Sequence, residues 1–441
     1  MKKKILIISY YWPPAGGPGV QRWLKFAKYL PEFNMTPVLF VPENANYPIK
    51  DNSLKSEVSK DLEIIKLPIF ELSGFLPRLK SLNSIRSGNI SKNKNQSILK
   101  KVFFFIRGNF FIPDMKIFWK RNSVNFLENY ISENNIETIV TTGPPHSLHL
   151  IGLELKRKLH INWISDFRDP WVNLNYLNRF HLLPFAKKYH KKLRDNVINN
   201  SDAVIVTSNR LKELYSKINP NIFQVTNGYD FNKPAVKLDK KFSISHIGSL
   251  YNERNPEFLW DIIEDLSENI NGFKKDLQIN LIGNNDKKMK QKLSKREFNN
   301  CIVYHDYVEH KKAIEFMCSS QVLLMLEVDD DESSYAIPGK LFDYLNSNRP
   351  IISIGPEQSE IREILSNTGS GKFFNYNDYN SLKFHFEKLY KDYLNNYGSS
   401  KNNQNIDVYH RKNLTSKLVD IINKTTRKVK PCNKGKIQGL N

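Results

Sequence analysis

The stretch Ala336-Ile337-Pro338-Gly339-Lys340-Leu341-Phe342-Asp343-Tyr344-Leu345 carries most of the fold prediction for this chain. Proline is favoured in the first turn of a helix, and a glycine beside it lets an anion approach the free N–H groups of that turn. Lys340 and Asp343 are three residues apart and therefore share a helix face, whereas the leucines and the phenylalanine form an apolar stripe that can pack inward. The pattern fits a helix that binds a phosphorylated ligand, and it equally fits an ordinary capped helix before a buried strand.

Outward from this stretch, short apolar runs alternate with amphipathic segments, which is typical of parallel sheets covered by helices. The alternation runs through two halves joined by a linker at about 228–241. It predicts strands at 4–10, 36–41, 62–67, 136–141, 161–165 and 202–208, then at 242–249, 277–282, 302–305, 322–326 and 350–354. Helices are expected at 209–216, 382–394 and 410–422, a loop at 369–371, and no strand after 202–208 in the first half.

Length and composition narrow the class of protein. The 441 residues suffice for two domains with sizeable cores, and 40% hydrophobic with 25% charged residues describes a soluble globular chain. Three widely spaced cysteines match no metal or disulfide framework, which fits a reducing cytosol. The apolar run after the first lysines is expected to be a buried strand and not a signal peptide, and no run approaches the roughly 20 residues of a membrane-spanning helix. A net charge of +21 indicates an anionic partner, which could be nucleic acid, a membrane surface or a phosphorylated small molecule.

Polar clusters follow three strands of the amino-terminal half. Since open α/β sheets bind ligands at the carboxyl ends of their strands, these clusters are candidates for a site. The glycine-rich loop with Gly16 and Gly17 can cradle an anion or form a flexible turn. A salt bridge between Asp166 and Arg168 would be the purely structural alternative for the charged loop. The clusters are Pro13-Pro14-Ala15-Gly16-Gly17-Pro18-Gly19, Thr142-Gly143-Pro144-Pro145-His146-Ser147 and Asp166-Phe167-Arg168-Asp169-Pro170-Trp171.

Two charged features stand out in the carboxyl-terminal half. Arg254 follows a predicted strand and precedes a predicted helix, where a guanidinium can form a bidentate pair with a diphosphate; the alternative is a surface arginine. The run Asp329-Asp330-Asp331-Glu332 could in principle hold a hard cation. Because Arg254 and Lys340 already supply positive charge for a phosphate, we expect a solvated acidic loop there and no metal.

These segments together resemble the retaining glycosyltransferases of family 4, in the branch that makes bacterial surface polysaccharides. The resemblance rests on the sequence of Ile337–Leu345, on the segments around His146 and at Asp166–Trp171, and on Gly248-Ser249-Leu250-Tyr251 before Arg254. It implies the GT-B fold, an α/β architecture of two facing Rossmann-like domains with parallel sheets and a cleft between them. The implied divisions are an acceptor-side domain at 1–230, a nucleotide-sugar-binding domain at 242–407 and a final helix at 408–423 that braces the first domain. The resemblance does not cover a basic insertion at about 78–101 or a basic tail at 424–441, which are inferred from their composition.

The resemblance also implies a role for each matching residue. Asp343 stands where the second glutamate of the family's pair binds ribose, and Tyr335 occupies the place of the first glutamate, for which Glu332 or the backbone at Ser333 and Ser334 could substitute. Residues implied to bind the donor and its phosphates are Gly16, Gly17, Arg254, Gly339, Lys340 and Asp343. Those implied to face the reacting sugar are His146, Asp166, Arg168 and Asp169, and those implied to border the base are Gly283, Asn284, Tyr307 and Val308.

The resulting hypothesis is a retaining glycosyltransferase that moves a sugar from a nucleotide-diphosphate sugar to a saccharide acceptor, lipid-linked, in capsule, O-antigen or exopolysaccharide synthesis. It requires no metal or other cofactor. The basic run 78–101, with seven Lys or Arg and no acid, and Phe103 to Phe105 are predicted to contact an anionic inner-membrane surface from the cytoplasm. Phe118 and Trp119 are expected in the core. The alternatives are a nucleotide-sugar epimerase or hydrolase, and a non-enzymatic basic membrane or nucleic-acid adaptor, although no basic-aromatic nucleic-acid motif is evident and nucleic acid is not expected as a partner.

Overall fold

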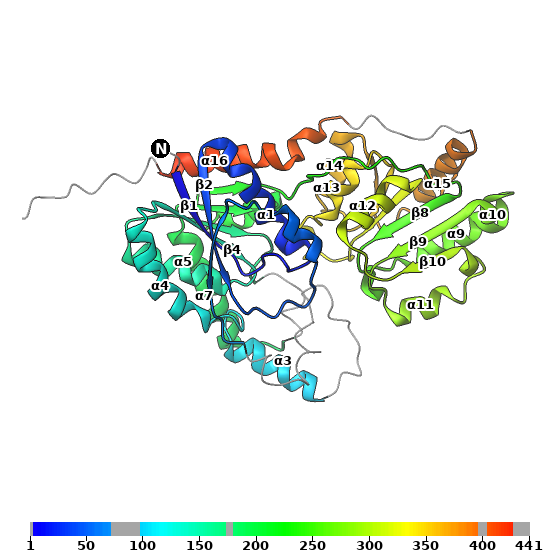
Figure 1. Ribbon diagram of the computed structural model, residues 1–441. Helices are drawn as coiled ribbons and strands as arrows, with labels where there is room; N and C mark the ends of the chain where they lie inside the picture. Colours follow the sequence, from blue (N-terminus) through cyan, green and yellow to red (C-terminus); the bar gives the residue numbers. More distant parts are fainter. Residues whose placement is uncertain (1–2, 72–97, 173–179, 396–403, 427–441) are drawn as a thin grey trace, which may run out of the picture.

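The computed structural model describes residues 3–71, 98–172, 180–395 and 404–426 (Figure 1). Most of the basic insertion expected at 78–101, and nearly all of the tail expected at 424–441, therefore lie outside the described residues. Two α/β domains follow one another along the chain, and each is built around one parallel sheet.

The amino-terminal domain contains a seven-stranded sheet in the order β3-β2-β1-β4-β5-β6-β7, and each pair of neighbours is parallel. Its central strands are buried along nearly their whole length, because helices cover both faces of the sheet. The strands are β1 Lys3–Ile8, β2 Met35–Pro42, β3 Glu63–Leu67, β4 Thr138–Gly143, β5 Asn162–Phe167, β6 Ala203–Val206 and β7 Ile222–Gln224.

Helices on the two faces of this sheet bury two separate hydrophobic clusters. One face packs against α4, α5, α7 and α8 through residues such as Leu127, Ile151 and Val197. The other packs against α1 and against the last helix of the chain, α16 (Arg411–Thr426), through residues such as Trp23 and Leu418. The helical segments are α1 Pro18–Tyr29, η1 Leu30–Phe33, η2 Asn52–Glu57, α3 Ile98–Phe110, α4 Trp119–Glu133, α5 Ser147–Lys158, α7 Pro184–Asn200 and α8 Asn209–Ser216.

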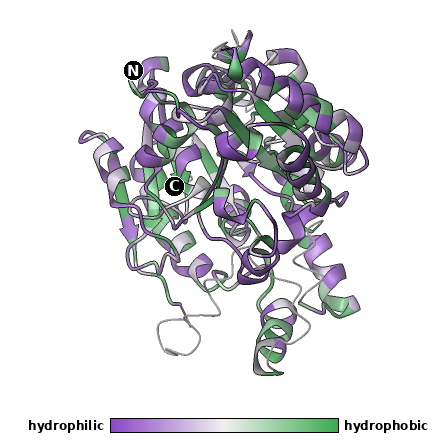
Figure 2. Cartoon of the chain, turned by 90° about the vertical axis from the view of Figure 1, so that its right-hand side faces the viewer, coloured by the Kyte–Doolittle hydropathy of each residue, from purple (hydrophilic) through white to green (hydrophobic). Residues whose placement is uncertain are grey.

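The carboxyl-terminal domain repeats the plan with six parallel strands in the order β10-β9-β8-β11-β12-β13. In both domains the strands are largely hydrophobic and the outward faces of the helices hydrophilic (Figure 2). The strands are β8 Phe242–Ile247, β9 Leu277–Ile282, β10 Ile302–His305, β11 Val322–Leu326, β12 Ile351–Ile354 and β13 Gly371–Phe374. The helical segments are η5 Asn252–Arg254, α9 Glu257–Asn269, α10 Phe273–Asp276, α11 Lys287–Leu293, η6 Asn299–Cys301, α12 His310–Ser319, η7 Ser333–Tyr335, α13 Lys340–Asn346, α14 Ile361–Thr368, α15 Tyr379–Leu394, η8 Ile406–Tyr409 and α16 Arg411–Thr426.

The last helix, α16, returns from the second domain to the first (Figure 1). Leu414, Leu418 and Ile422 belong to the hydrophobic cluster of the amino-terminal domain. At the start of α16, the Arg411 amide donates to the Tyr229 carbonyl at 3.0 Å. The chain end and the interdomain segment are thus joined at one place.

The two edge strands β7 and β13 were not expected from the sequence. Each has only three or four residues, and each pairs with a single neighbour at the edge of its sheet. Such short strands carry almost no periodicity, so that their pairing depends on the neighbouring strand and not on their own pattern. The strand β5 also ends two residues later than expected, at Phe167, which places Asp166 inside the sheet and not in the loop after it.

Strand order reverses once in each sheet, between β1 and β4 and between β8 and β11. At such a reversal the loops that leave the carboxyl ends of the two strands diverge and open a crevice, where α/β sheets commonly bind ligands. The Gly16–Gly17 loop and His146 follow the two strands of the first reversal, while Arg254 and Lys340 lie beyond the second.

Candidate functional site

Lys340 lies at the strand-order reversal of the carboxyl-terminal domain. Its Nζ is 3.2 Å from His246 Nε2, and His246 Nδ1 is 3.0 Å from the Leu324 carbonyl oxygen. The carbonyl can only accept, so Nδ1 carries the imidazole proton and Nε2 accepts from the lysine. His246 therefore fixes where the ammonium group of Lys340 lies.

Positive charge in this region is not fully neutralised by the protein. Burial lowers the pKa of Lys340 well below its usual range, and Arg254 acts in the same direction, whereas Glu327 raises it. Burial, followed by Lys340, holds the pKa of His246 well below its usual range. Because Arg254 disfavours the charged form of Lys340, this pair of basic side chains indicates a place where an anion would bind favourably.

Glu327 was missed by the sequence reasoning, which treated the acidic run after β11 as solvated. Only 4% of its surface is exposed, and its Oε2 accepts from Ser359 Oγ at 2.6 Å. Burial raises the pKa of Glu327 to about 7, although Ser359, Arg254 and Lys340 act against this shift. The available signal was its position, since Glu327 directly follows the strand that borders the reversal.

The first turn of α13 differs from the sequence expectation. The helix begins at Lys340, with Gly339 at its cap, and the amides of Leu341 and Phe342 already donate to the carbonyls of Pro338 and Gly339 at 3.0 and 3.3 Å. Among the first-turn amides, those of Gly339 and Lys340 have no backbone partner in the described part of the chain. At most two amides of this turn are therefore free to bind an anion, and the charged side chains contribute more to such a site.

Asp343 shares α13 with Lys340 but pairs with a different element. Its Oδ2 is 3.6 Å from Nε2 of His310, at the start of α12. Burial alone would lower the pKa of His310, but Asp343 raises it above the ordinary value, and Lys25 and Glu57 of the first domain also act on it. Asp343 thus lies where the two domains meet.

The residues expected near a base lie on neighbouring loops. The Gly283 amide donates to the His305 carbonyl at 3.0 Å, and the Leu250 amide donates to the Asn284 carbonyl at 3.1 Å. Gly283 has φ +120°, and a Cβ there would lie 2.8 Å from the Gly248 oxygen, so only glycine allows this approach. Tyr307 is exposed on the adjoining loop, and Val308 is partly buried next to it.

In the amino-terminal domain, the expectation that Asp166 faces a reacting sugar is not met. Its carboxylate is fully buried and accepts from Arg22, from Trp23 Nε1 at 2.7 Å and from Thr142 Oγ1 at 2.8 Å. Although burial alone would raise its pKa, Arg22 brings the pKa of Asp166 below its ordinary value. Arg22 also donates to the Val225 and Thr226 carbonyls at 2.9 and 2.8 Å, so this ion pair ties α1 and β5 to the segment that leads into the second domain.

The salt bridge between Arg168 and Asp166, the structural alternative from the sequence, does not form. The Arg168 guanidinium donates to the carbonyl of Gly19 at 2.8 Å and to that of Pro144, and it lies over the Tyr11 ring at 5.6 Å. Arg168 therefore joins the first turn of α1 to the loops that follow β4 and β5. Next to it, Asp169 is half-buried, and burial raises its pKa above the ordinary value.

His146 lies at the first strand-order reversal, immediately before α5. Its ring stacks on Trp171 at 4.8 Å between centroids, and neither ring nitrogen has a hydrogen-bond partner among the described residues. Burial lowers its pKa well below the ordinary value, with His149 and Arg168 acting in the same direction. The imidazole is therefore neutral. In the glycine loop, the Gly16 amide donates to the Ile49 carbonyl at 2.9 Å, and Gly17 caps α1.

Tyr335, which stands where the family's first glutamate would be, lies at a contact between the domains. Its carbonyl accepts from Ser208 Oγ at 2.6 Å, and the Arg210 guanidinium lies 4.8 Å from the centre of its ring. Arg210 also donates to Ser334 Oγ, and its amide donates to Glu360 Oε1 at 2.9 Å. This segment thus joins the domains and presents no carboxylate at position 335.

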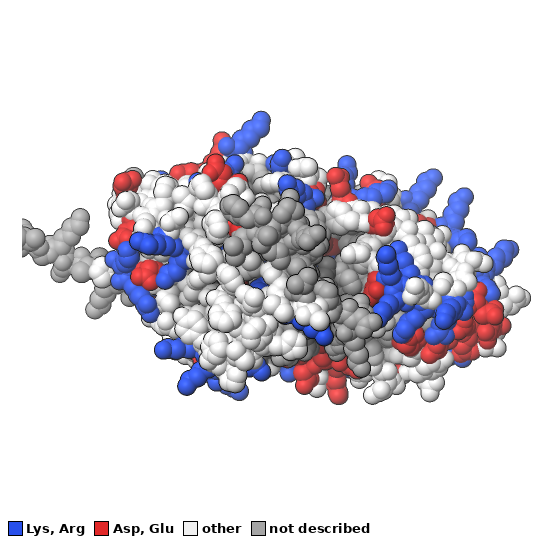
Figure 3. All heavy atoms as spheres, turned by 90° about the horizontal axis from the view of Figure 1, so that it is seen from below, with Lys and Arg blue, Asp and Glu red and all other residues white. Residues whose placement is uncertain are grey.

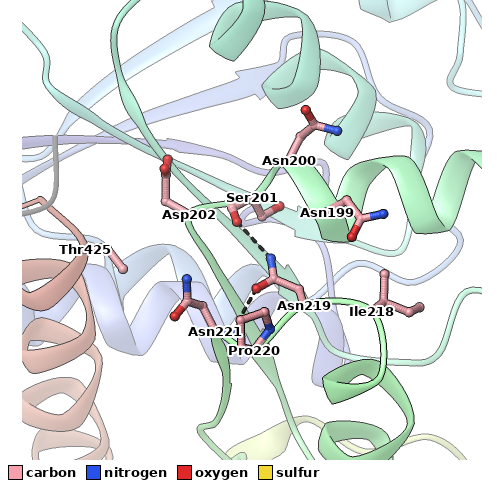
Figure 4. A pocket seen from close by; sticks show the side chains of 9 residues that line it. All are labelled: Asn199, Asn200, Ser201, Asp202, Ile218, Asn219, Pro220, Asn221 and Thr425. Atoms are coloured by element: carbon pink, nitrogen blue, oxygen red, sulfur yellow. Dashed lines mark hydrogen bonds between the residues drawn. The ribbon is translucent and has the colours of Figure 1, made fainter.

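A cavity of about 280 Å³ lies elsewhere, before β6 and β7 (Figure 4). Asn219 lies among its lining residues, donating to the Ser201 carbonyl at 3.1 Å and accepting from the Asn221 amide at 2.8 Å. This is the amino-terminal edge of the sheet, opposite to the edge where such sheets bind ligands.

No group of three or more His, Cys, Asp or Glu side chains that could hold a metal occurs within the described ranges.

Comparison with solved structures shows which fold this is. A glycosyltransferase from Rickettsia africae ESF-5 superposes with a TM-score of 0.63 at 12% identity, over 97% of this chain and 99% of that one. The Anabaena protein HepE in complex with UDP-glucose gives 0.60 at 11% identity, over 96% and 99%. The chain has the GT-B fold. The predicted fold class is thereby confirmed.

The same fold also accommodates other chemistry. A putative UDP-N-acetylglucosamine 2-epimerase from Listeria monocytogenes gives a TM-score of 0.54 at 12% identity, over 97% of this chain and 98% of that one. No protein-family model matches the sequence, and no curated protein matches it either. At these identities the likeness establishes architecture, and activity has to be argued from the site.

Proposed function

We propose that this protein is a retaining glycosyltransferase that transfers a sugar from a nucleoside-diphosphate sugar to a saccharide acceptor. The observation that carries the proposal is the position of Lys340 at the strand-order reversal of the second domain, where His246 holds its Nζ at 3.2 Å and where Arg254 and Glu327 both lie close enough to act on its pKa. The Anabaena protein of the same fold binds UDP-glucose, which supports a donor of this class.

In this proposal the diphosphate lies between Arg254 and Lys340. The bond between the anomeric carbon and the diphosphate oxygen breaks, and negative charge develops on that oxygen. Two cations held in place before the reaction stabilise this charge without reorganising, which lowers the barrier. His246 holds the ammonium of Lys340 in position.

Asp343 is proposed to accept hydrogen bonds from the ribose hydroxyls, and the loops at Gly283 and Tyr307 to border the base. The acceptor oxygen then bonds to the anomeric carbon on the face that the diphosphate leaves, and its proton passes to the departing diphosphate. His146, Arg168 and Asp169 are proposed to orient the donor sugar and the acceptor hydroxyl from the first domain. We assign no enzyme nucleophile and no metal. We further propose a lipid-linked acceptor in surface-polysaccharide synthesis, on the cytoplasmic side of the membrane.

Calorimetric titration with UDP, GDP and ADP tests the binding step and identifies the base. We expect one of the three nucleotides to bind. Its affinity should be lower for the Arg254→Ala variant and unchanged for the control variant Lys288→Ala, which replaces an exposed lysine on α11 of the same domain. Failure of all three to bind would overturn the proposal.

The GT-B likeness to the Listeria protein favours a second candidate, a nucleotide-sugar epimerase or hydrolase. Both activities would use the same diphosphate site but would not need an acceptor. Product analysis with the donor identified above separates them: a transferase forms a new saccharide only when acceptor is present, whereas an epimerase or hydrolase converts the donor at the same rate without it.

A further inference from the structure

Helix α3 carries an exposed apolar stripe. Ile98, Val102, Ile106 and Phe110 follow one another at intervals of four residues and expose 79, 48, 43 and 68% of their surface. Residues four apart lie on one side of a helix, so the stripe is continuous along it. The helix projects from the amino-terminal domain, and in Figure 2 it is the lowest helix and is largely hydrophobic.

The opposite side of α3 is anchored to the domain, so the stripe faces outward. Phe104 is buried against Phe180, and a Cβ on Gly108 would lie 2.6 Å from Phe180 Cβ. Asn109 Oδ1 accepts from the Leu183 amide at 2.7 Å, directly before α7. The expectation that Phe103 to Phe105 contact a membrane is corrected for Phe104, which belongs to the core. Phe103 and Phe105 are partly buried, and the exposed side chains are the neighbouring Val102 and Ile106.

The apolar surface continues onto α7. Phe185 and Tyr189, one turn apart near the start of that helix, are about half exposed. We define the α3–α7 face by these two residues and the four of the α3 stripe.

The prediction for Phe118 is corrected as well. Trp119 is in the core, but Phe118 is half exposed, and its ring centroid lies 6.3 Å from that of the exposed Phe70.

Basic residues accompany this face. Helix α3 contains no acid, and its Lys101 is exposed, whereas Arg107 lies over the Phe180 ring. Helix α7 contains five basic residues and one acid, Asp195, which pairs with Arg194. Lys187, Lys188, Lys191 and Lys192 are exposed. Viewed from the side on which α3 projects, much of the described surface of this domain is uncharged, with Lys and Arg and some Asp and Glu at its margins (Figure 3).

We propose that the α3–α7 face docks on an anionic lipid bilayer. Apolar side chains can enter the acyl boundary while neighbouring lysines bind the phosphate headgroups, and each mode strengthens the other. A second copy of the chain fits less well, because a self-interface would bring the same lysines together. The attachment is peripheral, since no helix in the described part of the chain is long and apolar enough to cross a bilayer. This inference does not depend on the proposed transfer reaction.

Co-sedimentation of the full-length protein with vesicles of phosphatidylcholine, with and without phosphatidylglycerol, tests the apolar part. We expect binding only to the anionic vesicles, and at least tenfold weaker binding of Phe110→Glu. The matched control is Phe384→Glu on α15 of the other domain, because Phe384 is also 68% exposed. Equal vesicle binding of Phe110→Glu and wild type would overturn the proposal, as would equal binding to both kinds of vesicle.

A second pair of double variants tests the contribution of the α7 lysines to vesicle binding. Lys188→Gln with Lys191→Gln should weaken binding by about thirtyfold, because each basic residue near an anionic surface is worth roughly 1 kcal/mol and about 1.4 kcal/mol is tenfold. Lys388→Gln with Lys391→Gln, which are exposed on α15 at the same spacing, should change it little. Analytical ultracentrifugation provides the competing outcome: a dimer that Phe110→Glu dissociates, without vesicle binding by the wild type, would assign this face to a second copy instead.

Discussion

Replacement of Lys340 by methionine removes the charge proposed to bind the diphosphate but keeps a side chain of similar length. The aliphatic stem of Lys340 packs near Gly248, and methionine should fill this space. A charge-assisted hydrogen bond contributes roughly 1.5–3 kcal/mol. The Kd for UDP, or for whichever diphosphate binds, should therefore rise by about 10- to 150-fold.

The Lys340→Met variant is also predicted to be at least as stable as the wild type. A lysine whose pKa is lowered on folding binds its proton less tightly in the folded state, so it destabilises that state at any pH below its unfolded pKa. Lys340→Met removes this cost, and its Tm should equal or exceed that of the wild type in differential scanning calorimetry. A Kd within twofold of the wild-type value, with Tm retained, would show that Lys340 does not bind the diphosphate.

Three further predictions concern the surrounding charges. A bound diphosphate should raise the pKa of both Lys340 and Glu327, so binding should take up protons, and affinity should fall as the pH rises from about 7 to 9; calorimetry in two buffers measures the uptake. Asp343→Asn should weaken binding of the nucleoside diphosphate about tenfold or more but leave inorganic pyrophosphate unaffected, because only the former carries ribose. Asp166→Asn leaves Arg22 buried without its counter-ion and should cost about 3–5 kcal/mol in urea unfolding.

Each of these predictions has a control or a contradicting result. Release of protons on binding would contradict the first. Equal weakening of both ligands by Asp343→Asn would indicate a general effect on folding. For the third, Glu128→Gln removes the partner of Lys158 in an exposed pair and should cost about 1 kcal/mol or less; a similar small loss for Asp166→Asn would show that the buried pair is not structural.

Much of the fold could be predicted from the sequence, because buried parallel strands are recognisable as continuous apolar runs. The strands at 277–282, 302–305 and 322–326 and the helix at 209–216 agree with the structure residue for residue. Their boundaries are set by local features such as the Ser208 cap, whose side chain accepts from the Leu211 amide.

The site was less predictable because its contacts join distant parts of the chain. Asp166 looked like a loop acid beside Arg168, yet its partner is Arg22, 144 residues away. His246 and His310 drew no attention, since a lone histidine has no local signal, and only the fold places them against Lys340 and Asp343. Glu327 had a positional signal, but the acidic run that follows it obscured that signal.

A nucleoside diphosphate is proposed to bind between Arg254 and Lys340. A crystal structure of the protein with the diphosphate that binds most tightly tests this proposal most directly. We expect diphosphate oxygens within hydrogen-bonding distance of Lys340 Nζ and the Arg254 guanidinium, with the ribose next to Asp343. A diphosphate bound elsewhere, such as in the cavity at Asn219, with Lys340 still paired only to His246, would contradict it.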